Sequence, residues 1–355
     1  MNKILDIYTD YLICQNSYAT ATGLPEMLCG YVSHDQFTRF LNKEALGSKD
    51  LREYVKPEAR RNEKQSDGVL ILDDSIEEKP YTDENEIMFW HYSHAKGRHV
   101  KGVNILSCLV RYGKVSLPIG YRIIHKDIVF CDIETKKEMK KASLTKNERF
   151  RNLVKQGYTN KVLFDYVLSD NWFGAKDNLE YIHNLQKYFI IGIKSNRIIA
   201  LSEDSKKKGQ FQKVSSLTLE EGKSVKVWLK GIKFPVLLFK KIFINEDNST
   251  GVLYLVFNDI NHDAEHLYGI YQKRWRIETY HKSGKQNASL AKSLTKKVIS
   301  QSNHIFASII AFCKLEMLQL KTSLNHFALK YKLILKANQA AMTELQNLHK
   351  LIVAA

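Results

Sequence analysis

The chain has 355 residues, of which 44% are hydrophobic and 11% aromatic, so it can bury a substantial core and is too long for one small domain. Its 54 Lys and Arg residues outnumber its 38 Asp and Glu residues, and the resulting formal net charge of +16 favours a polyanionic partner. Because no apolar run approaches the roughly 18 residues of a transmembrane helix, nucleic acid is favoured over a membrane, and no membrane association is expected.

Residues 1–10 include two aspartates and lack the apolar run of a signal peptide, which favours a cytoplasmic location. Five cysteines are scattered along the chain without metal-ligand spacing, and we expect them to be reduced, mostly buried thiols. They are Cys14, Cys29, Cys108, Cys131 and Cys313.

Residues 1–62 are expected to form a helical N-terminal region. Two short helical segments, residues 20–28 and 33–41, are separated by a glycine, and Ser33 is a suitable N-cap for the second. This arrangement resembles a helix-turn-helix, which would place Arg39 against the major groove of DNA. Any helical hairpin gives a similar pattern, so the DNA contact depends on what the rest of the chain indicates.

Residues 63–196 have the order of elements of an α/β sheet. Three apolar runs come first; the first is continuous, as in a strand covered on both faces, and the next two are joined by a hairpin turn. A helix, a strand, a second helix and a further strand follow, after a charged stretch at residues 133–146 that we expect to be a loop or the lead into the helix. In chain order the segments are residues 69–72, 103–110, 115–124, 147–156, 162–168, 175–185 and 188–193. This order predicts a mixed sheet of the RNase H-like type.

A β-rich insertion is expected at residues 197–258, where short strands alternate with turns. Its strands are predicted at residues 225–229, 236–244 and 252–257. Residues 259–315 would then complete the core, and residues 316–355 would form a helical C-terminal segment. The predicted fold is α/β: an RNase H-like mixed-sheet catalytic core interrupted by a β-rich insertion, with a helical N-terminal region and a helical C-terminus.

Acidic residues follow two of the predicted strands. Asp74, or its neighbour Asp73, follows the first strand, and Asp170 follows the strand at residues 162–168. Carboxylates at the carboxyl ends of neighbouring strands can converge on a metal ion, although acids in turns after strands are common.

A third acid lies in a segment of unusual composition. If residues 271–285 form one helix, Tyr271, Arg274, Glu278 and Lys285 fall within a sector of about 60°. A solvated surface helix also mixes charges. Phosphodiester cleavage, however, needs a carboxylate to hold a divalent metal and cations to bind the neighbouring phosphates, which explains this particular mixture.

The spacing Y-x2-R-x3-E-x6-K of these four residues resembles the signature of a large branch of bacterial insertion-sequence DDE transposases, which move DNA by cut and paste. Leu72-Asp73-Asp74-Ser75 is similar to the first motif of that family, and Leu168-Ser169-Asp170 is similar to the second. The β-rich insertion before Glu278 is typical of the same branch. The resemblance covers about residues 65–310.

The resemblance implies that Asp74, Asp170 and Glu278 are the catalytic residues and that they bind two Mg2+ ions, with Mn2+ as a substitute. Asp73 is the rival for the first position, because successive strand residues point to opposite faces and only one of the pair can face the metal. The serine after Asp74 favours Asp74.

The resemblance also implies contacts with double-stranded DNA, namely the terminal repeats of the transposon and the target. The residues expected to bind DNA are Tyr271, Arg274, Lys285, Lys282, His281, Arg39 and Tyr254, the last by stacking on a flipped base. Trp275 points away from this group and is expected in the core. The implied reaction is a nick, a hairpin that is reopened, and transfer of the new 3'-OH to target DNA, performed by a homodimer on DNA at the bacterial nucleoid.

Two other functions remain open from the residues alone. The chain could be a transposase relic that binds DNA without cutting it. It could also be a host RNase H-like nuclease, which would cleave without specificity for transposon ends.

Overall fold

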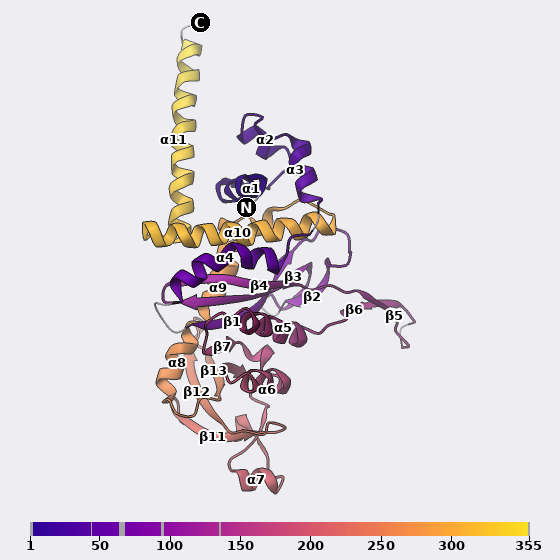
Figure 1. Ribbon diagram of the computed structural model, residues 1–355, viewed down its shortest axis with the longest axis vertical. Coiled ribbons are helices and arrows are strands. Elements are labelled where there is room, and N and C mark those ends of the chain that lie inside the picture. Colours follow the sequence, from indigo (N-terminus) through magenta and orange to yellow (C-terminus); the bar gives the residue numbers. More distant parts are fainter. Residues whose placement is uncertain (1–2, 44, 64–67, 94–95, 135, 354–355) are drawn as a thin grey trace. The chain divides into compact units, whose positions relative to one another are not determined.

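The computed structural model describes residues 3–43, 45–63, 68–93, 96–134 and 136–353 (Figure 1). The chain forms two compact units. The first, here called the helical unit, comprises Met1–Val55, Glu77–Gly102 and Thr279–Ala355, and the second, the sheet unit, comprises Lys56–Ile76 and Val103–Glu278.

The sheet unit is built around five strands of a mixed sheet. They are β1 (Val69–Glu78), β3 (Arg98–Tyr112), β4 (Val115–Ile123), β7 (Tyr166–Ser169) and β8 (Tyr188–Ile193), and they lie in the order β4-β3-β1-β7-β8. β3 and β4 pair antiparallel, whereas β1 pairs parallel with β7 and β7 parallel with β8. The four residues that begin β1 are each at most 1% exposed, as expected for a strand covered on both faces.

Two helices pack beside these strands. α5 (Lys146–Thr159) begins at a capping box in which Thr145 and Glu148 bond to each other's backbone N–H groups. α6 (Lys176–Asn184) lies against α5 and β8. The rings of Phe150 on α5 and Phe173, which precedes α6, stack with centroids 4.9 Å apart. These contacts fix the start of α5 next to the carboxyl ends of the strands.

The predicted β-rich stretch extends the same sheet. Beyond β8 the strands follow in the order β13, β12, β11, β9 and β10, and all of these pair antiparallel. Their bounds are β9 (Ile198–Ala200), β10 (Gln212–Lys213), β11 (Ser224–Leu229), β12 (Val236–Ile244) and β13 (Thr250–Phe257), with the short helix α7 (Glu203–Lys207) after β9. The insertion therefore lengthens the sheet.

A hairpin occupies part of the stretch expected to be a loop. β5 (Ile128–Cys131) and β6 (Glu138–Lys141) pair antiparallel. Almost all of their side chains are exposed, so the hairpin has no buried face and leaves no alternation of apolar and polar residues in the sequence. Within residues 133–146, which were expected to be a loop or the lead into a helix, the expectation missed β6, while the residues after β6 do lead into α5.

The helical unit contains the N-terminal helices, the strand β2 (Phe89–Ser93) and the C-terminal helices. Its helices include α1 (Lys3–Cys14), α2 (Gly23–Met27), α3 (His34–Leu41), α10 (Val298–Thr322) and α11 (His326–Val353), while α4 (Ser48–Asn62) and α9 (Trp275–Asn287) run from one unit into the other. Every residue from 303 to 313 of α10 is buried, as in a helix that is apolar all round and lies in a core. Ser33 caps α3 through a capping box with Gln36, which confirms the predicted N-cap.

The cysteines differ from expectation. All five are free, but Cys14, Cys29 and Cys131 are exposed and only Cys108 and Cys313 are buried, so the expectation of mostly buried thiols was wrong. Among the described helices, none has the length and apolar composition that a membrane crossing requires.

A buried histidine joins α1 to α10 within the helical unit. His304 Nδ1 lies 2.7 Å from the Tyr8 hydroxyl and its Nε2 lies 3.0 Å from the Ser289 carbonyl oxygen. Because a carbonyl can only accept, Nε2 donates to Ser289. Burial lowers the pKa of the imidazole to about 4, so the ring is neutral near pH 7 and Nδ1 accepts from the Tyr8 hydroxyl.

We expect the helical unit to lose stability as the pH falls from 6.5 to 4. The unfolded chain takes up a proton on His304 near pH 6.5, whereas the folded chain resists it down to about pH 4; the loss amounts to about 3 kcal/mol in all. Denaturant unfolding at pH 7 and at pH 4.5 measures it. His304→Gln should flatten this pH dependence. The remaining dependence would include the contribution of His326, because burial lowers the pKa of His326 to about 4 as well. An unchanged pH dependence in His304→Gln would contradict a neutral buried His304.

Candidate active site

The register of two parallel strands brings two acids together. β1 and β7 pair Ile71 with Leu168, and the same offset continued by two residues places Asp73 beside Asp170. The Ser169 hydroxyl donates to the Leu72 carbonyl oxygen at 2.8 Å, which ties the strands together just before the acids. Side chains in register on neighbouring strands project from the same face. The carboxyl end of β7 therefore lies next to the middle of β1, and not next to the end of β1 as expected, since β1 continues to Glu78.

Asp170 is held at the start of a tight turn. It caps the short 3-10 helix η1 (Asn171–Phe173), and its carboxylate accepts from the Trp172 backbone N–H at 3.1 Å. This turn packs closely on β8: a Cβ on Gly192 would lie 2.9 Å from the Asn171 nitrogen. Gly192 thus permits the approach that orients the Asp170 carboxylate.

Asp73 lies in a buried and strongly negative environment. Its side chain is 14% exposed, and one carboxylate oxygen lies 3.6 Å from Arg274 Nη1. Burial, and then the carboxylate of Asp170, raise the pKa of Asp73 to about 8. The carboxylates of Asp74 and Glu278 add to the same shift. Burial also raises the pKa of Asp170. The site therefore concentrates negative charge that a bound cation would stabilise.

Asp74 has different partners. One of its carboxylate oxygens lies 2.7 Å from Lys146 Nζ and accepts a hydrogen bond of 2.6 Å from the Asn104 amide. The side-chain oxygen of Asn104, Oδ1, is buried without a hydrogen-bond partner among the described residues. The sequence favoured Asp74 as a metal ligand, and this stays a prediction, but the structure pairs Asp74 with a lysine and puts Asp73 nearer to Arg274.

The segment with the Y-x2-R-x3-E-x6-K spacing is not one helix, and that expectation was wrong. Tyr271 lies in the last turn of α8 (Ala264–Gln272), Arg274 lies in the turn that follows, and Glu278 and Lys285 lie on α9. In the turn the N–H groups of residues 273 and 274 bond to carbonyls three residues back, which is the tighter 3-10 pattern. No Gly or Pro marks this break in the sequence, so helical periodicity could not reveal it.

The turn nevertheless brings the first three of these residues together. The Arg274 guanidinium lies over the Tyr271 ring, 5.7 Å from its centroid, and Arg274 Nη1 is 3.4 Å from a Glu278 carboxylate oxygen. The Arg274 side chain is 16% exposed, and it forms ion pairs with Asp73 and Glu278 at the same time. Its charge offsets part of the repulsion between these two carboxylates.

The donor chemistry suits a hard divalent cation, because carboxylate oxygens are the ligands that Mg2+ prefers. In the described part of the chain, no three side chains of His, Cys, Asp or Glu are close enough to hold one ion. Arg274 lies between two of the carboxylates instead. The chemistry and charge of these residues fit a divalent metal ion. Their side chains, however, are not arranged as a complete set of metal ligands.

The other predicted DNA-binding residues of α9 belong to the helical unit. Lys285 Nζ lies 3.9 Å from a carboxylate oxygen of Glu77. Burial raises the pKa of Glu77, and the charge of Lys285 opposes this rise. Lys282 Nζ lies 5.5 Å from the centroid of the Phe327 ring, and the His281 ring packs against Tyr280. Both lysines therefore already have partners within their own unit.

Three more residues named from the sequence lie outside the acidic cluster. Tyr254 on β13 is half-buried and pairs across the sheet with Lys240 and Ile193. Arg39 is exposed on α3 and donates to the Asp35 carbonyl oxygen. Trp275 is 66% exposed, so its expected place in the core was wrong; it begins α9 directly after the turn.

An exposed aromatic platform beside Asp170 was not identified from the sequence. Trp172 is 46% exposed, and Lys146 Nζ and Lys194 Nζ lie 5.5 Å and 5.7 Å from its ring centroid. Aromatic rings and cations side by side can stack on bases and bind phosphates. The signal available in the sequence was an aromatic residue two positions after the second acid.

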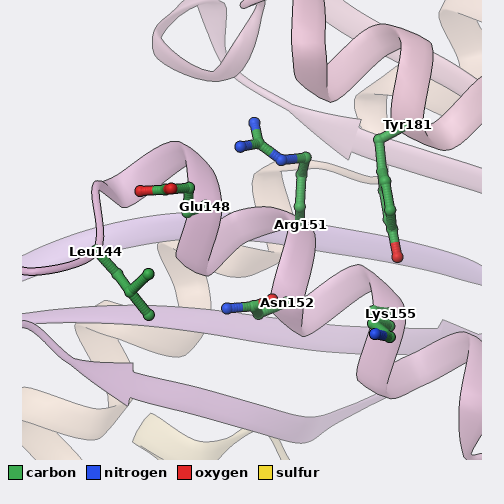
Figure 2. Close-up of a pocket in the computed structure, with 6 residues that line it drawn as sticks. All are labelled: Leu144, Glu148, Arg151, Asn152, Lys155 and Tyr181. Carbon is green, nitrogen blue, oxygen red and sulfur yellow. The ribbon is translucent and has the colours of Figure 1, made fainter.

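A surface pocket of about 290 Å³ lies elsewhere in the sheet unit, between α5 and α6 (Figure 2). It is lined by Leu144, Glu148, Arg151, Asn152, Lys155 and Tyr181. None of the clustered acids lines it, so the chemistry of the site does not belong to this pocket.

The match to a protein family indicates an endonuclease. The model of a family described as DDE superfamily endonuclease matches residues 3–209, more than half of the chain. No curated protein matches. Among solved structures, the chain is similar to the Drosophila P element transposase strand transfer complex, at 14% identity and a TM-score of 0.26 over 53% of this chain. The matched part is 37% of that protein's chain.

We expect Lys146→Met to lower the free energy of unfolding by about 1–3 kcal/mol, because it leaves the largely buried Asp74 carboxylate without its cation. Asp74→Asn should cost less in the Lys146→Met background than alone, which a double-mutant cycle in denaturant measures. Lys155→Met, at an exposed lysine of the same helix, is the control and should change stability by less than about 0.5 kcal/mol. Equal losses in the two lysine variants would contradict the ion pair.

Proposed function

The chain belongs to the DDE superfamily endonucleases, and from this membership we propose that it is the DNA transposase of an insertion sequence. It binds transposon ends and catalyses metal-dependent DNA cleavage and strand transfer. The observation that carries the proposal is that Arg274 pairs with both Asp73 and Glu278, while the Asp170 carboxylate lies close enough to raise the pKa of Asp73. The formal net charge of +16 supports DNA as the partner.

We propose that the sheet unit is an RNase H-like core. The strand order β4-β3-β1-β7-β8, with three parallel strands at one side and a hairpin at the other, supports this assignment. The core expected from the sequence, residues 63–196 and 259–315, overlaps the sheet unit at residues 63–76, 103–196 and 259–278, and the insertion at residues 197–258 extends its sheet. The helical parts at residues 1–62 and 316–355 flank it.

Within this core, Asp73, Asp170 and Glu278 are the residues that would hold Mg2+, or Mn2+ in its place. Bound metal ions would activate the attacking hydroxyl and stabilise the leaving oxygen. We favour Asp73 over Asp74 because Asp73 shares the register of Asp170 and pairs with Arg274. Asp74, held by Lys146 and Asn104, would position the strand and the start of α5.

The basic and aromatic residues around the acids would bind the DNA strand. Arg274 can bind a phosphate through two parallel hydrogen bonds, and the Tyr271 ring below it holds the guanidinium in place. Trp172 would stack on a base, with Lys146 and Lys194 at the adjoining phosphates. The remaining DNA contacts proposed are Lys285, Lys282, His281, Tyr254 and Arg39.

The proposed reaction is cut and paste through a DNA hairpin, at the terminal repeats of the element and then at target DNA. Two ends must be held together for this reaction, which supports a homodimer on DNA. The spacing Y-x2-R-x3-E-x6-K supports this branch of the family, and the place of action would be the bacterial nucleoid.

We expect Asp73→Asn to lower the rate of end cleavage by about a hundredfold or more, because it removes charge from the metal site. Asp74→Asn should lower it by about tenfold or less, since its carboxylate acts through Lys146. Nicking of a plasmid that carries the cognate ends, with Mg2+ or Mn2+, measures both. The reverse ranking would assign the first metal position to Asp74.

Glu278→Gln should abolish cleavage while leaving end binding nearly intact, because it removes the charge of one carboxylate but little volume. Gel-shift and nicking assays on the same DNA ends separate the two effects. The unaltered chain is the control: if it bound the ends and never cut them, it would be a relic without catalysis. If it cut DNA without regard to the ends, a host nuclease would be the better assignment.

A further inference from the structure

The C-terminal helix α11 is anchored through its first two turns. His326 and Lys330 are 4% and 6% exposed. The His326 ring is hydrogen-bonded to the Ser283 hydroxyl at 2.8 Å, and Lys330 Nζ donates to the Gln15 carbonyl oxygen at 2.6 Å and to that of Ile13. From residue 331 to residue 350 every side chain is exposed except that of Ile334, which is half-buried. In Figure 1 this part of α11 extends past α10.

The exposed part of α11 carries many large apolar side chains. Tyr331 is 66% exposed, Met342 61%, and Leu345 and Leu348 49% each. A helix in water owes most of its stability to the packing of an apolar face, and contiguous apolar surface on a soluble protein marks an interaction site. We therefore expect the exposed apolar side chains of α11 to pack against a partner.

Three of these residues, Tyr331, Leu345 and Leu348, lie on one stripe, and Met342 lies next to it. Steps of three and four residues alternate along one stripe, here called the α11 seam: Tyr331, Ile334, Asn338, Ala341, Leu345 and Leu348. This is the heptad spacing of a coiled coil, sustained over about three heptads. The lysines of this stretch, Lys332, Lys336 and Lys350, all fall at heptad positions away from the seam.

Asn338 specifies which helix pairs with the seam. An unpaired amide costs free energy when an apolar groove covers it, whereas the Asn side chain carries both a donor and an acceptor and can pair with its own copy. In a parallel pair of identical helices Asn338 faces Asn338. In the antiparallel pair centred on the seam it would face Ala341 and stay unpaired.

We propose that α11 pairs in parallel with α11 of a second copy of this chain, as a two-stranded coiled coil. A single polar residue in the seam of such a coil selects register and strand number. The protein is then a dimer before it meets DNA. This inference does not depend on the proposed function, because no acid of the cluster lies on α11.

Sedimentation equilibrium of the full chain without DNA tests the proposal. We expect a dimer of twice 41.1 kDa at micromolar concentration. The double variant Leu345→Glu, Leu348→Glu should raise the dissociation constant of the dimer by about a hundredfold or more, because it places charges in the seam. Lys336→Glu, on the far side of α11, is the matched control and should leave the constant unchanged. A monomer at all concentrations, or an unchanged constant in the double variant, would overturn the proposal.

Crosslinking tests the direction of pairing. Asn338→Cys is placed in a chain whose exposed cysteines, Cys14, Cys29 and Cys131, are replaced by serine. Oxidation should then give a disulfide-linked dimer in high yield, whereas Lys336→Cys in the same chain should not. A dimer that forms without crosslinking at position 338 would overturn parallel pairing. Circular dichroism shows that each variant keeps its helices, since the altered side chains are exposed in the single chain.

Discussion

Repulsion among carboxylates at one edge of the sheet is the constraint on which the site depends. Asp73 lies on β1, Asp170 directly follows the neighbouring strand β7, and Glu278 lies close enough to raise the pKa of Asp73 further. Buried acids of like charge cannot all ionise without compensation. The fold supplies two cations for this purpose, Arg274 beside Asp73 and Glu278, and Lys146 beside Asp74. Both come from the ends of helices or the turn between them, outside the strands that carry the acids.

This arrangement links metal binding to DNA binding within the proposed function. Arg274 cannot bind two carboxylates and a phosphate fully at once, because its donors form one planar fork. A divalent cation at the carboxylates would take over the compensation that Arg274 supplies, and the guanidinium would then be available to a phosphate. The ring of Tyr271, 5.7 Å from the guanidinium carbon of Arg274, would keep the guanidinium near the acids.

Much of the sheet could be predicted from the sequence, because buried strands leave continuous apolar runs. β8 and β12 have the predicted bounds, and β4 differs by one residue. Elements without a buried face were missed: the hairpin β5–β6 exposes almost all of its side chains. The helical unit collects three separate stretches of chain, and local patterns carry no information about such long-range association. α11 was expected to be helical. The sequence alone could not show that the side chains of its seam are exposed and therefore available to a partner.

The site residues, like the fold, could be predicted only in part from the sequence. Residue types and spacing in the sequence were enough to select Asp170, Arg274 and Glu278 as a group. Spacing could not show that Arg274 lies in a turn, because a 3-10 bond pattern needs no Gly or Pro. Nor could it choose between Asp73 and Asp74, since a shift of one residue along a strand exchanges the two faces. The pairing of β1 with β7 bears on this choice, and it joins residues 97 positions apart, as the bond from Ser169 to Leu72 does. The motif names both candidates, and the register of the sheet is the ground on which we propose Asp73.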